Sequence, residues 1–471
     1  MLSHIAEKAS MPLILLGVAL FVVSLGFGMF TPILPQYAAQ LGIDATSLGF
    51  AYSLYNVALI IFLIPSGIMA DRVGRVKTIV IGMILFSISS LMLVFVKDLL
   101  QFSLARMIEG VGAAVVTPAV FALTADLVPT ERRGKGMGFT STMETVGSLA
   151  SPTVGGLIAQ TVGLTYPFYA ASAMALLSGA LVLPVKDRTL RNRSRSSGSS
   201  ALDIFISLRR NVEQSRSLLV LSLRGFVVGI TQGLFVLVFV LYMAFNVGMQ
   251  PAEVGFSFTL MSGSMLAFTF LAGHLSDSFG RKPFVILGGI IIASGVIAFS
   301  FTHSAPLVYL VSLVLGFGVG LNNAPINALL ADCVIPEIRA KVVGGYEVIL
   351  GLGRALGVAF LGGLYAISAL APFYLLGGLM LATVVLVALF VAEPVSKAGI
   401  SISPIPSEEK PALVPEHGVA VLSASLEDGK TTTLVERAMA GWMECPACRR
   451  LILRDSRFCD CCGARVSPAH R

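Results

Sequence analysis

An arginine and a glutamate lie three residues apart near the middle of a long apolar segment. Arg106 and Glu109 belong to the run 100–122, where an offset of three places both side chains on one face of a helix. Charged groups inside a membrane are costly and usually mark a pathway for an ion or a solute. Burial favours the neutral acid whereas the guanidinium favours the carboxylate, which suits reversible protonation. The alternative interpretation is a static buried ion pair that fixes helix packing.

Two more charges lie inside apolar segments. Glu144 shares a helical stripe with small residues such as Gly147, which makes it a second candidate for proton transfer. The alternative is a hydrogen-bonded glutamate at the rim of a cavity. Arg354 lies near the middle of the run 342–367, where it could bind a carboxylate of a solute or an acid across a cavity. A structural pair with Glu347, seven residues earlier, is the competing interpretation.

Five of the six cysteines lie close together near the end of the chain. Four of their thiolates could hold one tetrahedral Zn²⁺ ion, and they come from two Cys-x-x-Cys pairs, Cys445 with Cys448 and Cys459 with Cys462. The spacer is shorter than usual, but the segment resembles small zinc ribbons, and iron in a rubredoxin-like site is the alternative. We expect a structural zinc ribbon over residues 441–467. The arginines around it could contact anionic lipid, RNA or an acidic protein; we favour a solvated surface.

The composition indicates a membrane protein. Of the 471 residues, 55% are hydrophobic and 13% are charged, which is about half of the charged fraction of soluble chains. The net charge of +7 does not indicate nucleic acid as a partner, because the basic residues follow the loops between the apolar runs. The first apolar run is too long for the core of a cleavable signal peptide.

Twelve runs are long enough to cross a bilayer core of about 30 Å as helices. They cover residues 12–36, 47–70, 77–96, 100–122, 137–161, 165–185, 218–243, 253–275, 283–302, 306–330, 342–367 and 371–391. The loops on one side contain nearly all of the loop Lys and Arg, and the opposite loops contain only Lys97. The positive-inside rule therefore places the basic loops and both termini in the cytoplasm, in a protein of the plasma (inner) membrane.

One sequence pattern occurs twice. GIMADRVGRVK at 67–77 and GHLSDSFGRKP at 273–283 lie 206 positions apart, each between two apolar runs. The repeat predicts an all-α integral membrane protein with 12 transmembrane helices in two pseudo-symmetric six-helix halves, an arrangement usual in transporters that rock one half against the other. The expected divisions are an N-terminal half (1–185), a cytoplasmic linker (186–217), a C-terminal half (218–392), a disordered linker (393–440) and the zinc ribbon (441–467).

Four motifs in order resemble those of the major facilitator superfamily. The GxxxDRxGR turn after the second run is that family's most recognisable motif. Residues 25–35 resemble the first-helix signature of twelve-helix drug:proton antiporters, and residues 106–113 resemble the motif RxxQGxGA with Glu in place of Gln. Residues 138–156 resemble the antiporter motif of the fifth helix, with Ser151 in place of a glycine.

The resemblance covers roughly residues 12–392 and implies two sets of functional residues. It implies a conformational gate at the cytoplasmic end, where the Asp of each turn contacts the opposite half when the inner side closes. Its members would be Asp71, Arg75, Asp126, Asp277, Arg281 and Asp332. The alternative is that these charges only anchor the loops in the cytoplasm. It also implies a substrate cavity between helices 1, 4, 7 and 10, with the candidates Phe27, Phe30, Tyr55, Asn56, Gln232, Phe235, Asn322, Asn323 and Arg354.

These observations predict a secondary active transporter rather than an enzyme. The first interpretation is proton-coupled efflux of small hydrophobic or amphipathic molecules by alternating access, since the sequence has no GxxxxGK[ST] loop for ATP. One alternative is a proton symporter for an organic anion or metabolite, with Arg106 or Arg354 as the anion contact. Another is a membrane sensor that binds a ligand and signals through the zinc ribbon.

The expected partners follow from the same reasoning. They are a small-molecule substrate, protons, the lipid bilayer and a cytoplasmic protein that binds the zinc ribbon. We expect Zn²⁺ as a structural ion, and neither an organic cofactor nor a nucleic acid. We expect the chain to act as a monomer.

Overall fold

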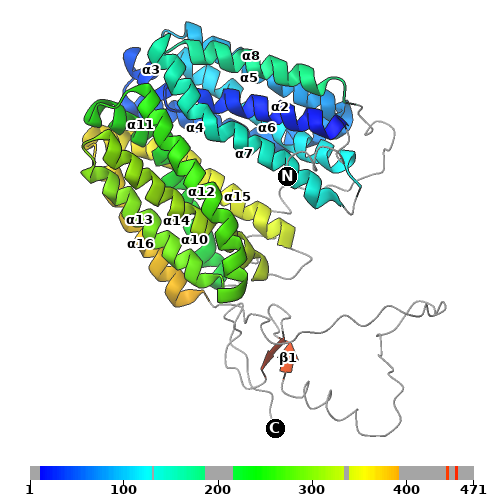
Figure 1. The fold of residues 1–471 in the computed structure, drawn as a ribbon, viewed down its shortest axis with the longest axis vertical. Coiled ribbons are helices and arrows are strands. Elements are labelled where there is room, and N and C mark those ends of the chain that lie inside the picture. Colours follow the sequence, from blue (N-terminus) through cyan, green and yellow to red (C-terminus); the bar gives the residue numbers. More distant parts are fainter. Residues whose placement is uncertain are drawn as a thin grey trace, which may run out of the picture.

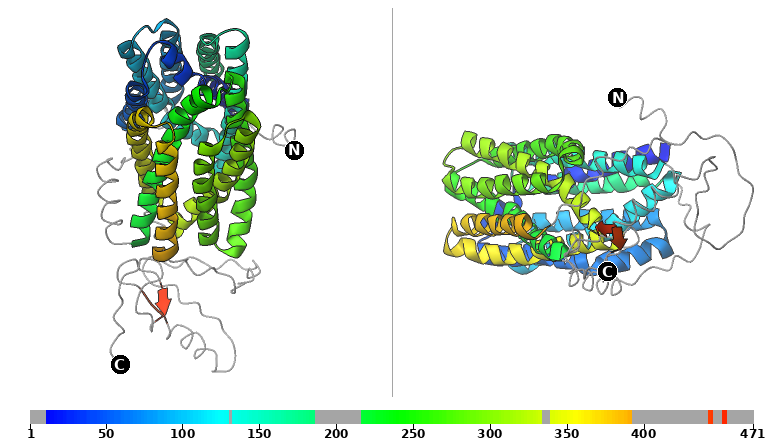
Figure 2. Two further views of the ribbon diagram at one scale, coloured as in Figure 1. Left: turned by 90° about the vertical axis from the view of Figure 1, so that its left-hand side faces the viewer. Right: turned by 90° about the horizontal axis from the view of Figure 1, so that it is seen from below.

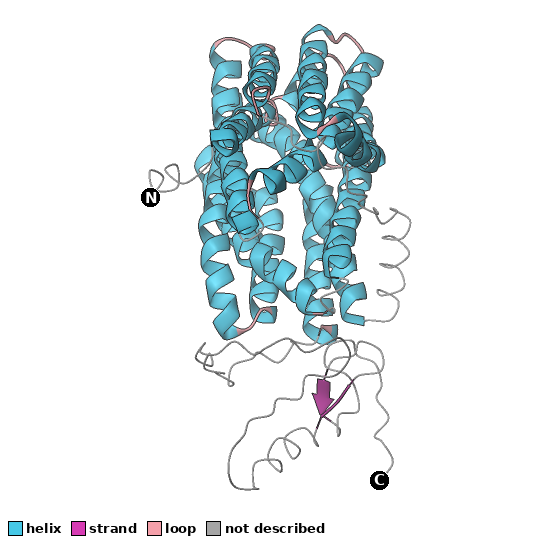
Figure 3. Cartoon of the chain, turned by 90° about the vertical axis from the view of Figure 1, so that its right-hand side faces the viewer, coloured by secondary structure: helices cyan, strands magenta, loops and turns pink. Residues whose placement is uncertain are grey.

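The computed structural model of the protein describes residues 11–129, 132–185, 216–333 and 339–391, together with two strands at 442–444 and 451–453. Helices make up nearly all of this part of the chain (Figure 3). They form two bundles, which meet near α3 (Leu34–Gln40) and α11 (Val240–Tyr242) and diverge toward the other end, like the arms of a V (Figure 1). The first bundle (blue to cyan) and the second (green to orange) can also be followed in Figure 2.

The described elements follow the chain order. The first bundle contains α2 (Met11–Met29), α3, α4 (Ala45–Val73), α5 (Arg75–Phe95), α6 (Leu99–Leu127), α7 (Arg133–Thr161) and α8 (Tyr166–Val182). The second bundle contains α10 (Arg216–Leu234), η3 (Phe235–Phe239), α11, η4 (Met243–Val247), α12 (Pro251–Phe279), α13 (Lys282–Ala298), η5 (Phe299–Phe301), α14 (Ala305–Asp332), α15 (Arg339–Ile367) and α16 (Ala371–Phe390). The strands β1 (Trp442–Glu444) and β2 (Leu451–Leu453) pair in antiparallel fashion.

Ten helical segments of the described residues are long and apolar enough to cross a membrane. The two remaining predicted runs are also helical: α7 has 29 residues but is rich in Gly, Ser and Thr, and α8 is apolar but has 17 residues. Every predicted run therefore coincides with a helix, and the chain is a multi-pass membrane protein. That all twelve cross the bilayer stays a prediction.

A glycine makes the tight turn of each repeated motif possible. Gly74 lies between α4 and α5, and Gly280 lies at the end of α12 before α13. Their φ angles are 108° and 89°, a region in which a side chain is strained. The sequence repeat thus produces the same turn in both bundles. We call the end of the molecule that carries these turns the basic end, and the end near α3 and α11 the narrow end.

The bundles touch at the narrow end through two pairs of helices, α4 with α15 and α7 with α12. In the first pair, Gly49 faces the backbone of Val358, and Gly362 faces the backbone of Ala45. A Cβ atom at either glycine would overlap the facing carbonyl oxygen. Small residues therefore let the two backbones approach each other directly.

The second helix pair is built in the same way. Gly156 on α7 faces the backbone at Pro251, and Gly255 on α12 faces the carbonyl of Pro152. The hydroxyl groups of Thr153 and Thr259 form a hydrogen bond of 2.7 Å across this contact. The four glycines of the two seams thus lie about one turn from the end of their helix at the narrow end.

The buried apolar side chains follow the same division. At the narrow end, one hydrophobic core includes residues of both bundles, such as Leu34 and Leu241. Toward the basic end each bundle has a core of its own, with Ile79 in the first and Val285 in the second. The bundles therefore share a core where they meet and are packed independently where they diverge.

Candidate functional site

A hollow of about 150 Å³ lies between the two bundles. On one side its walls come from α2, residues 30–31, the first residue of α3, and helices α4 and α6; on the other side they come from η3 and α15. They are Phe27, Phe30, Thr31, Leu34, Tyr52, Tyr55, Asn56, Arg106, Val236, Arg354 and Val358. We call this space the first hollow. Six of the predicted site residues line it, including Arg106 and Arg354.

Arg106 and Glu109 form an ion pair on α6. The guanidinium also lies over the rings of Tyr52 and Tyr55 of α4, at 4.6 and 4.7 Å from their centroids, a favourable position for a cation. Glu109 is fully buried, and one of its carboxylate oxygens (Oε1) has no hydrogen-bond partner. Arg106 therefore faces the first hollow while Glu109 lies behind it, shielded by its partner.

Arg354 faces the first hollow from the second bundle. Its Nε donates a hydrogen bond of 3.1 Å to Oε1 of Gln232. The competing expectation of a pair with Glu347 differs from the structure: within the described residues, Arg354 forms no ion pair, and Glu347 is exposed. Two helical turns separate the two side chains along α15, which is too far for a close pair. Within the part of the chain that the structure describes, no acidic side chain therefore balances the charge of Arg354.

A second hollow of about 400 Å³ lies inside the first bundle, between α2, α4, α5, α6 and α7. Its walls are Val23, Ser24, Phe27, Gly28, Tyr55, Leu59, Met83, Phe86, Gly112, Ala113, Val116, Thr117, Glu144 and Ser148. The hydroxyls of Thr117 and Ser148 bond to carbonyls of their own helices. Glu144 makes no hydrogen bond or ion pair in the part of the chain that the structure describes, and its side chain is exposed to this space.

Four predicted cavity residues of the second bundle line neither hollow. Gln232 is exposed and bonds to Arg354, and Asn323 is exposed on α14. Phe235 is nearly buried and packs its ring against those of Phe239 and Phe299. Asn322 is buried inside the bundle, where it accepts a hydrogen bond of 2.6 Å from Nη2 of Arg224. Sequence alone did not show this because it depends on how each helix is rotated.

Arg224 is a buried charge that the sequence analysis missed. It lies on α10 and has no exposed surface. Besides Asn322, it reaches the carbonyl of Val285 at 3.4 Å, and its Nε and Nη1 have no hydrogen-bond partner. Gly289 leaves room for it, since a Cβ there would lie 3.0 Å from Nη1. An arginine within the apolar run 218–243 was the signal that could have revealed it.

The predicted gate residues form matching contacts inside each bundle. Arg75 pairs with Asp126 and donates a bond of 2.6 Å to the carbonyl of Ala122. Arg281 pairs with Asp332 and lies 3.5 Å from Asp277. It also donates a bond of 3.0 Å to the carbonyl of Ala328, 206 positions after Ala122. The arginine of each repeated turn therefore binds the end of the equivalent helix, α6 in the first bundle and α14 in the second.

Asp71 makes no ion pair across the bundles within the described residues, and its side chain is exposed. Asp277 is also largely exposed. The side chains at the start of α15, where a partner of Asp71 is expected, lie outside the described residues. The bundles diverge at the basic end, so the gate contact stays a prediction for a state in which this end is closed.

Ser151, which departs from the expected glycine motif of α7, has a matching glycine on α2. It is buried, and its hydroxyl donates a bond of 2.9 Å to the carbonyl of Ser148. Its side chain occupies the space in which a Cβ of Gly28 would lie. The close packing of α2 against α7 is therefore kept, with the glycine on the opposite helix.

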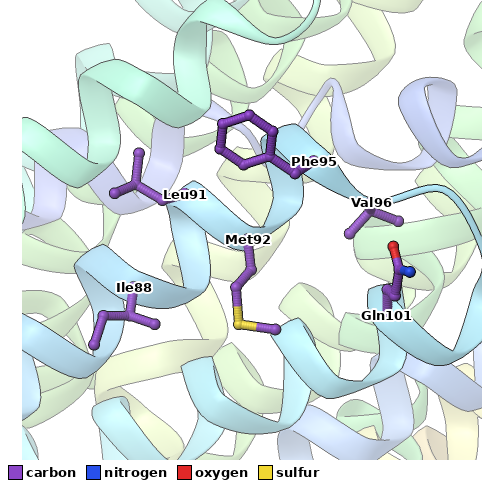
Figure 4. A pocket seen from close by; sticks show the side chains of 6 residues that line it. All are labelled: Ile88, Leu91, Met92, Phe95, Val96 and Gln101. Atoms are coloured by element: carbon purple, nitrogen blue, oxygen red, sulfur yellow. The ribbon is translucent and has the colours of Figure 1, made fainter.

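A third hollow, of about 350 Å³, differs in character (Figure 4). Its walls are Ile88, Leu91, Met92, Phe95, Val96 and Gln101, from α5 and the start of α6. None of these side chains is charged, and none comes from the second bundle. This space is therefore separate from the charged hollows.

The four predicted zinc ligands lie outside the described residues. Within the described residues, no group of His, Cys, Asp and Glu could hold a metal ion. The strands β1 and β2 flank the segment 445–450 in sequence, which contains the first Cys-x-x-Cys pair. The zinc site stays a prediction.

Two helical bundles that share one narrow contact, with charged side chains facing hollows at and beside their interface, define a membrane transport protein. The model of the Major Facilitator Superfamily matches residues 16–225 and 221–423, and the chain belongs to this family. The prediction of a transporter rather than an enzyme is thereby confirmed.

Relatives with assigned names include two resistance proteins. The chain is 26% identical over 371 residues to the quinolone resistance protein NorA of Staphylococcus aureus (strain MSSA476), covering 78% of this chain and 93% of that protein. It is 26% identical over 387 residues to multidrug resistance protein 2 of Bacillus subtilis (strain 168), covering 81% and 95%. A bacterial homolog of the human lysosomal transporter Spinster, solved inward-facing and unoccupied, shares the fold with a TM-score of 0.64. It is 18% identical, over 80% of this chain and 94% of that one.

Proposed function

We propose that the protein exports small hydrophobic or amphipathic molecules in exchange for protons, by alternating access. The observation that carries the proposal is Glu144, a carboxylate within a helical span that faces a hollow and has no partner in the described protein. Such a group can exchange a proton with water or with a bound solute. The names of the two resistance proteins support export as the direction.

The division of contacts between the bundles supports alternating access. The seams at Gly49 and Gly255 hold the narrow end closed, while the bundles diverge at the basic end. With the basic loops in the cytoplasm, this is a state open to the cytoplasm, in a protein of the plasma membrane with both termini inside. We propose that Asp71 and Asp277 contact the opposite bundle when the basic end closes and the seams part.

The two carboxylates inside the first bundle support different roles. Glu109 is buried behind Arg106, and removing either partner would leave an uncompensated buried charge. Glu144 has no such partner and is open to the second hollow. We therefore assign the exchanged proton to Glu144, with the Arg106–Glu109 pair holding the wall of the first hollow in place.

Transport driven by an imposed pH gradient tests the proposal. The full-length protein is reconstituted into liposomes with an acidic interior, and uptake of ethidium is followed by fluorescence. We expect accumulation that a protonophore abolishes, its loss in Glu144→Gln, and unchanged accumulation in the matched control Glu347→Gln. Uptake by the wild type that is equal with and without the gradient would overturn proton coupling.

For the tail, we propose a structural Zn²⁺ ion held by Cys445, Cys448, Cys459 and Cys462, in a ribbon that binds a cytoplasmic protein and has no part in transport. The antiparallel strands on either side of the first Cys-x-x-Cys pair in sequence are compatible with this proposal, and the four thiolates match the ligand set of a structural zinc site. Metal analysis of the purified, monomeric protein should give about one zinc per chain. Cys445→Ser should lose the zinc and keep ethidium transport; a metal-free wild type would contradict the site.

A further inference from the structure

Two unbalanced charges of opposite sign face the hollows. Glu144 faces the second hollow without a hydrogen bond or ion pair in the described part of the chain. Arg354 faces the first hollow, and the partner that it has there is the neutral amide of Gln232. Arg106 also faces the first hollow, but Glu109 balances its charge. The first hollow is therefore effectively cationic and the second is anionic.

The two hollows adjoin across a common aromatic wall. Phe27 and Tyr55 line both of them, with ring centroids 6.3 Å apart. Phe30 extends this wall in the first hollow and Phe86 extends it in the second, each with its ring 5.7 Å from that of Phe27. A continuous aromatic surface thus leads from the arginine to the glutamate.

Each part of this surface selects a different chemical group. An arginine binds a carboxylate through two parallel hydrogen bonds, and a carboxylate binds an ammonium group. Aromatic rings stack with the aromatic body of a solute. A solute with a cationic group alone would leave Arg354 unbalanced, and a solute with an anionic group alone would leave Glu144 unbalanced. Unbalanced charges inside a span are costly, so a solute with both groups gains most.

We infer that the transported molecule is a dipolar aromatic compound, whose carboxylate binds Arg354 and whose ammonium group binds Glu144. Its aromatic body lies against Phe27 and Tyr55, across the wall that the two hollows share. The inference rests on the proposed transport function and names the substrate class of the same site.

A matched series of compounds tests the inference by equilibrium binding to the purified full-length protein. The parent compound is an aminomethyl-biphenyl-carboxylic acid, which carries both groups at opposite ends. Its methyl ester keeps the ammonium group alone, and its N-acetyl derivative keeps the carboxylate alone. We expect the parent to bind about tenfold more tightly than either derivative, as loss of one charged contact implies.

Variants assign each group to its residue. Glu144→Gln should weaken the parent and the ester about tenfold and leave the N-acetyl derivative unchanged, whereas Arg354→Gln should weaken the parent and the N-acetyl derivative and leave the ester unchanged. In each variant, the compound whose binding is retained shows that the site is folded. Glu347→Gln, an exposed carboxylate on α15 that lines neither hollow, should leave all three affinities unchanged.

Two results would overturn the inference: equal binding of the parent and either derivative to the wild type, or equal weakening of all three compounds by both variants. Ethidium uptake under a pH gradient separates this failure from failure of the proposed function. Gradient-driven uptake without the binding pattern means that the substrate class is wrong. The binding pattern without gradient-driven uptake means that proton coupling is wrong and the site is right.

Discussion

Charged side chains inside the helical spans differ in how their charge is balanced. Arg106 has a carboxylate and two tyrosine rings, whereas Arg224 has an amide and a carbonyl. Glu144 has no partner in the described protein. Because an unbalanced charge in a span is costly, we expect the paired groups to hold the structure and Glu144, like Arg354, to bind a proton or a charged group of a solute.

The Arg224–Asn322 hydrogen bond should contribute little to the net stability of the protein, but removing only one of its two partners should be destabilising. Asn322→Ala removes the best acceptor of a buried guanidinium and should lower the stability by about 1–3 kcal/mol. Arg224→Met with Asn322→Leu removes both polar groups and should restore the stability to that of the wild type or above it. Thermal unfolding of the purified protein in detergent measures both; a double variant less stable than Asn322→Ala would contradict this account.

Asp44 should stabilise the start of α4 in a pH-dependent manner. Its carboxylate accepts bonds from the amides of Thr46 and Ser47 and from the Ser47 hydroxyl, at 2.9, 3.1 and 2.6 Å. The Ser47 bonds hold the pKa of the Asp44 carboxyl below its ordinary value. The stabilisation is thus present at neutral pH and is lost as the pH falls through the lowered pKa.

Asp44→Ala should therefore cost about 0.5–2 kcal/mol at pH 7, as measured by thermal unfolding. The difference from the wild type should shrink on acidification, when the carboxyl group of the wild type becomes protonated. A difference that grows toward acidic pH would show that the cap does not act through its ionised form.

At the scale of elements, glycines decide how the helices approach. Gly255 follows Gly49 by 206 positions, and Gly362 follows Gly156 by 206, so the seam between the bundles belongs to the same repeat as the turns. The apolar runs predicted the helices because segment length is a local property. The seams and the Ser151–Gly28 contact were not predicted, because they depend on which face of a helix meets its neighbour.

A larger residue at Gly28 should be tolerated only when Ser151 is made smaller at the same time. Gly28→Ala would overlap the Ser151 side chain and should lower stability by about 1–3 kcal/mol. Adding Ser151→Gly returns the space and should recover most of this loss in thermal unfolding. Gly378→Ala, at a helical position with open space, is the control and should be nearly neutral. A double variant no more stable than Gly28→Ala would rule out this packing.

A larger side chain in the seam should open the narrow end. Gly255→Leu would overlap the backbone at Pro152, so the bundles must part there. The distance between spin labels attached through unnatural amino acids at Val162 and Phe245, both exposed, should shift to longer values. The same labels in Gly378→Leu should keep the wild-type distances, and an unchanged distribution in Gly255→Leu would show that this contact does not hold the end closed.

At the scale of the whole molecule, one shared core at the narrow end and two separate cores at the basic end describe two bodies joined by a hinge-like contact. The duplicated turn predicted two halves. It did not predict the divergence at the basic end, because the free energies of alternative states of a transporter differ by amounts that no local pattern encodes. The sequence predicted which charged residues face the cavity, such as Arg354. It did not predict their hydrogen-bond partners, such as Gln232, because these depend on how each helix is rotated.

Proton movement driven by a substrate gradient tests exchange most directly. Ethidium, a permanently charged dye, is added outside liposomes that contain the full-length protein and an internal pH indicator, with no pH gradient imposed. Exchange predicts that dye entering through the protein moves protons out, so that the interior becomes alkaline relative to protein-free liposomes. Acidification of the interior would indicate symport and contradict exchange, and dye entry without any pH change would contradict proton coupling altogether.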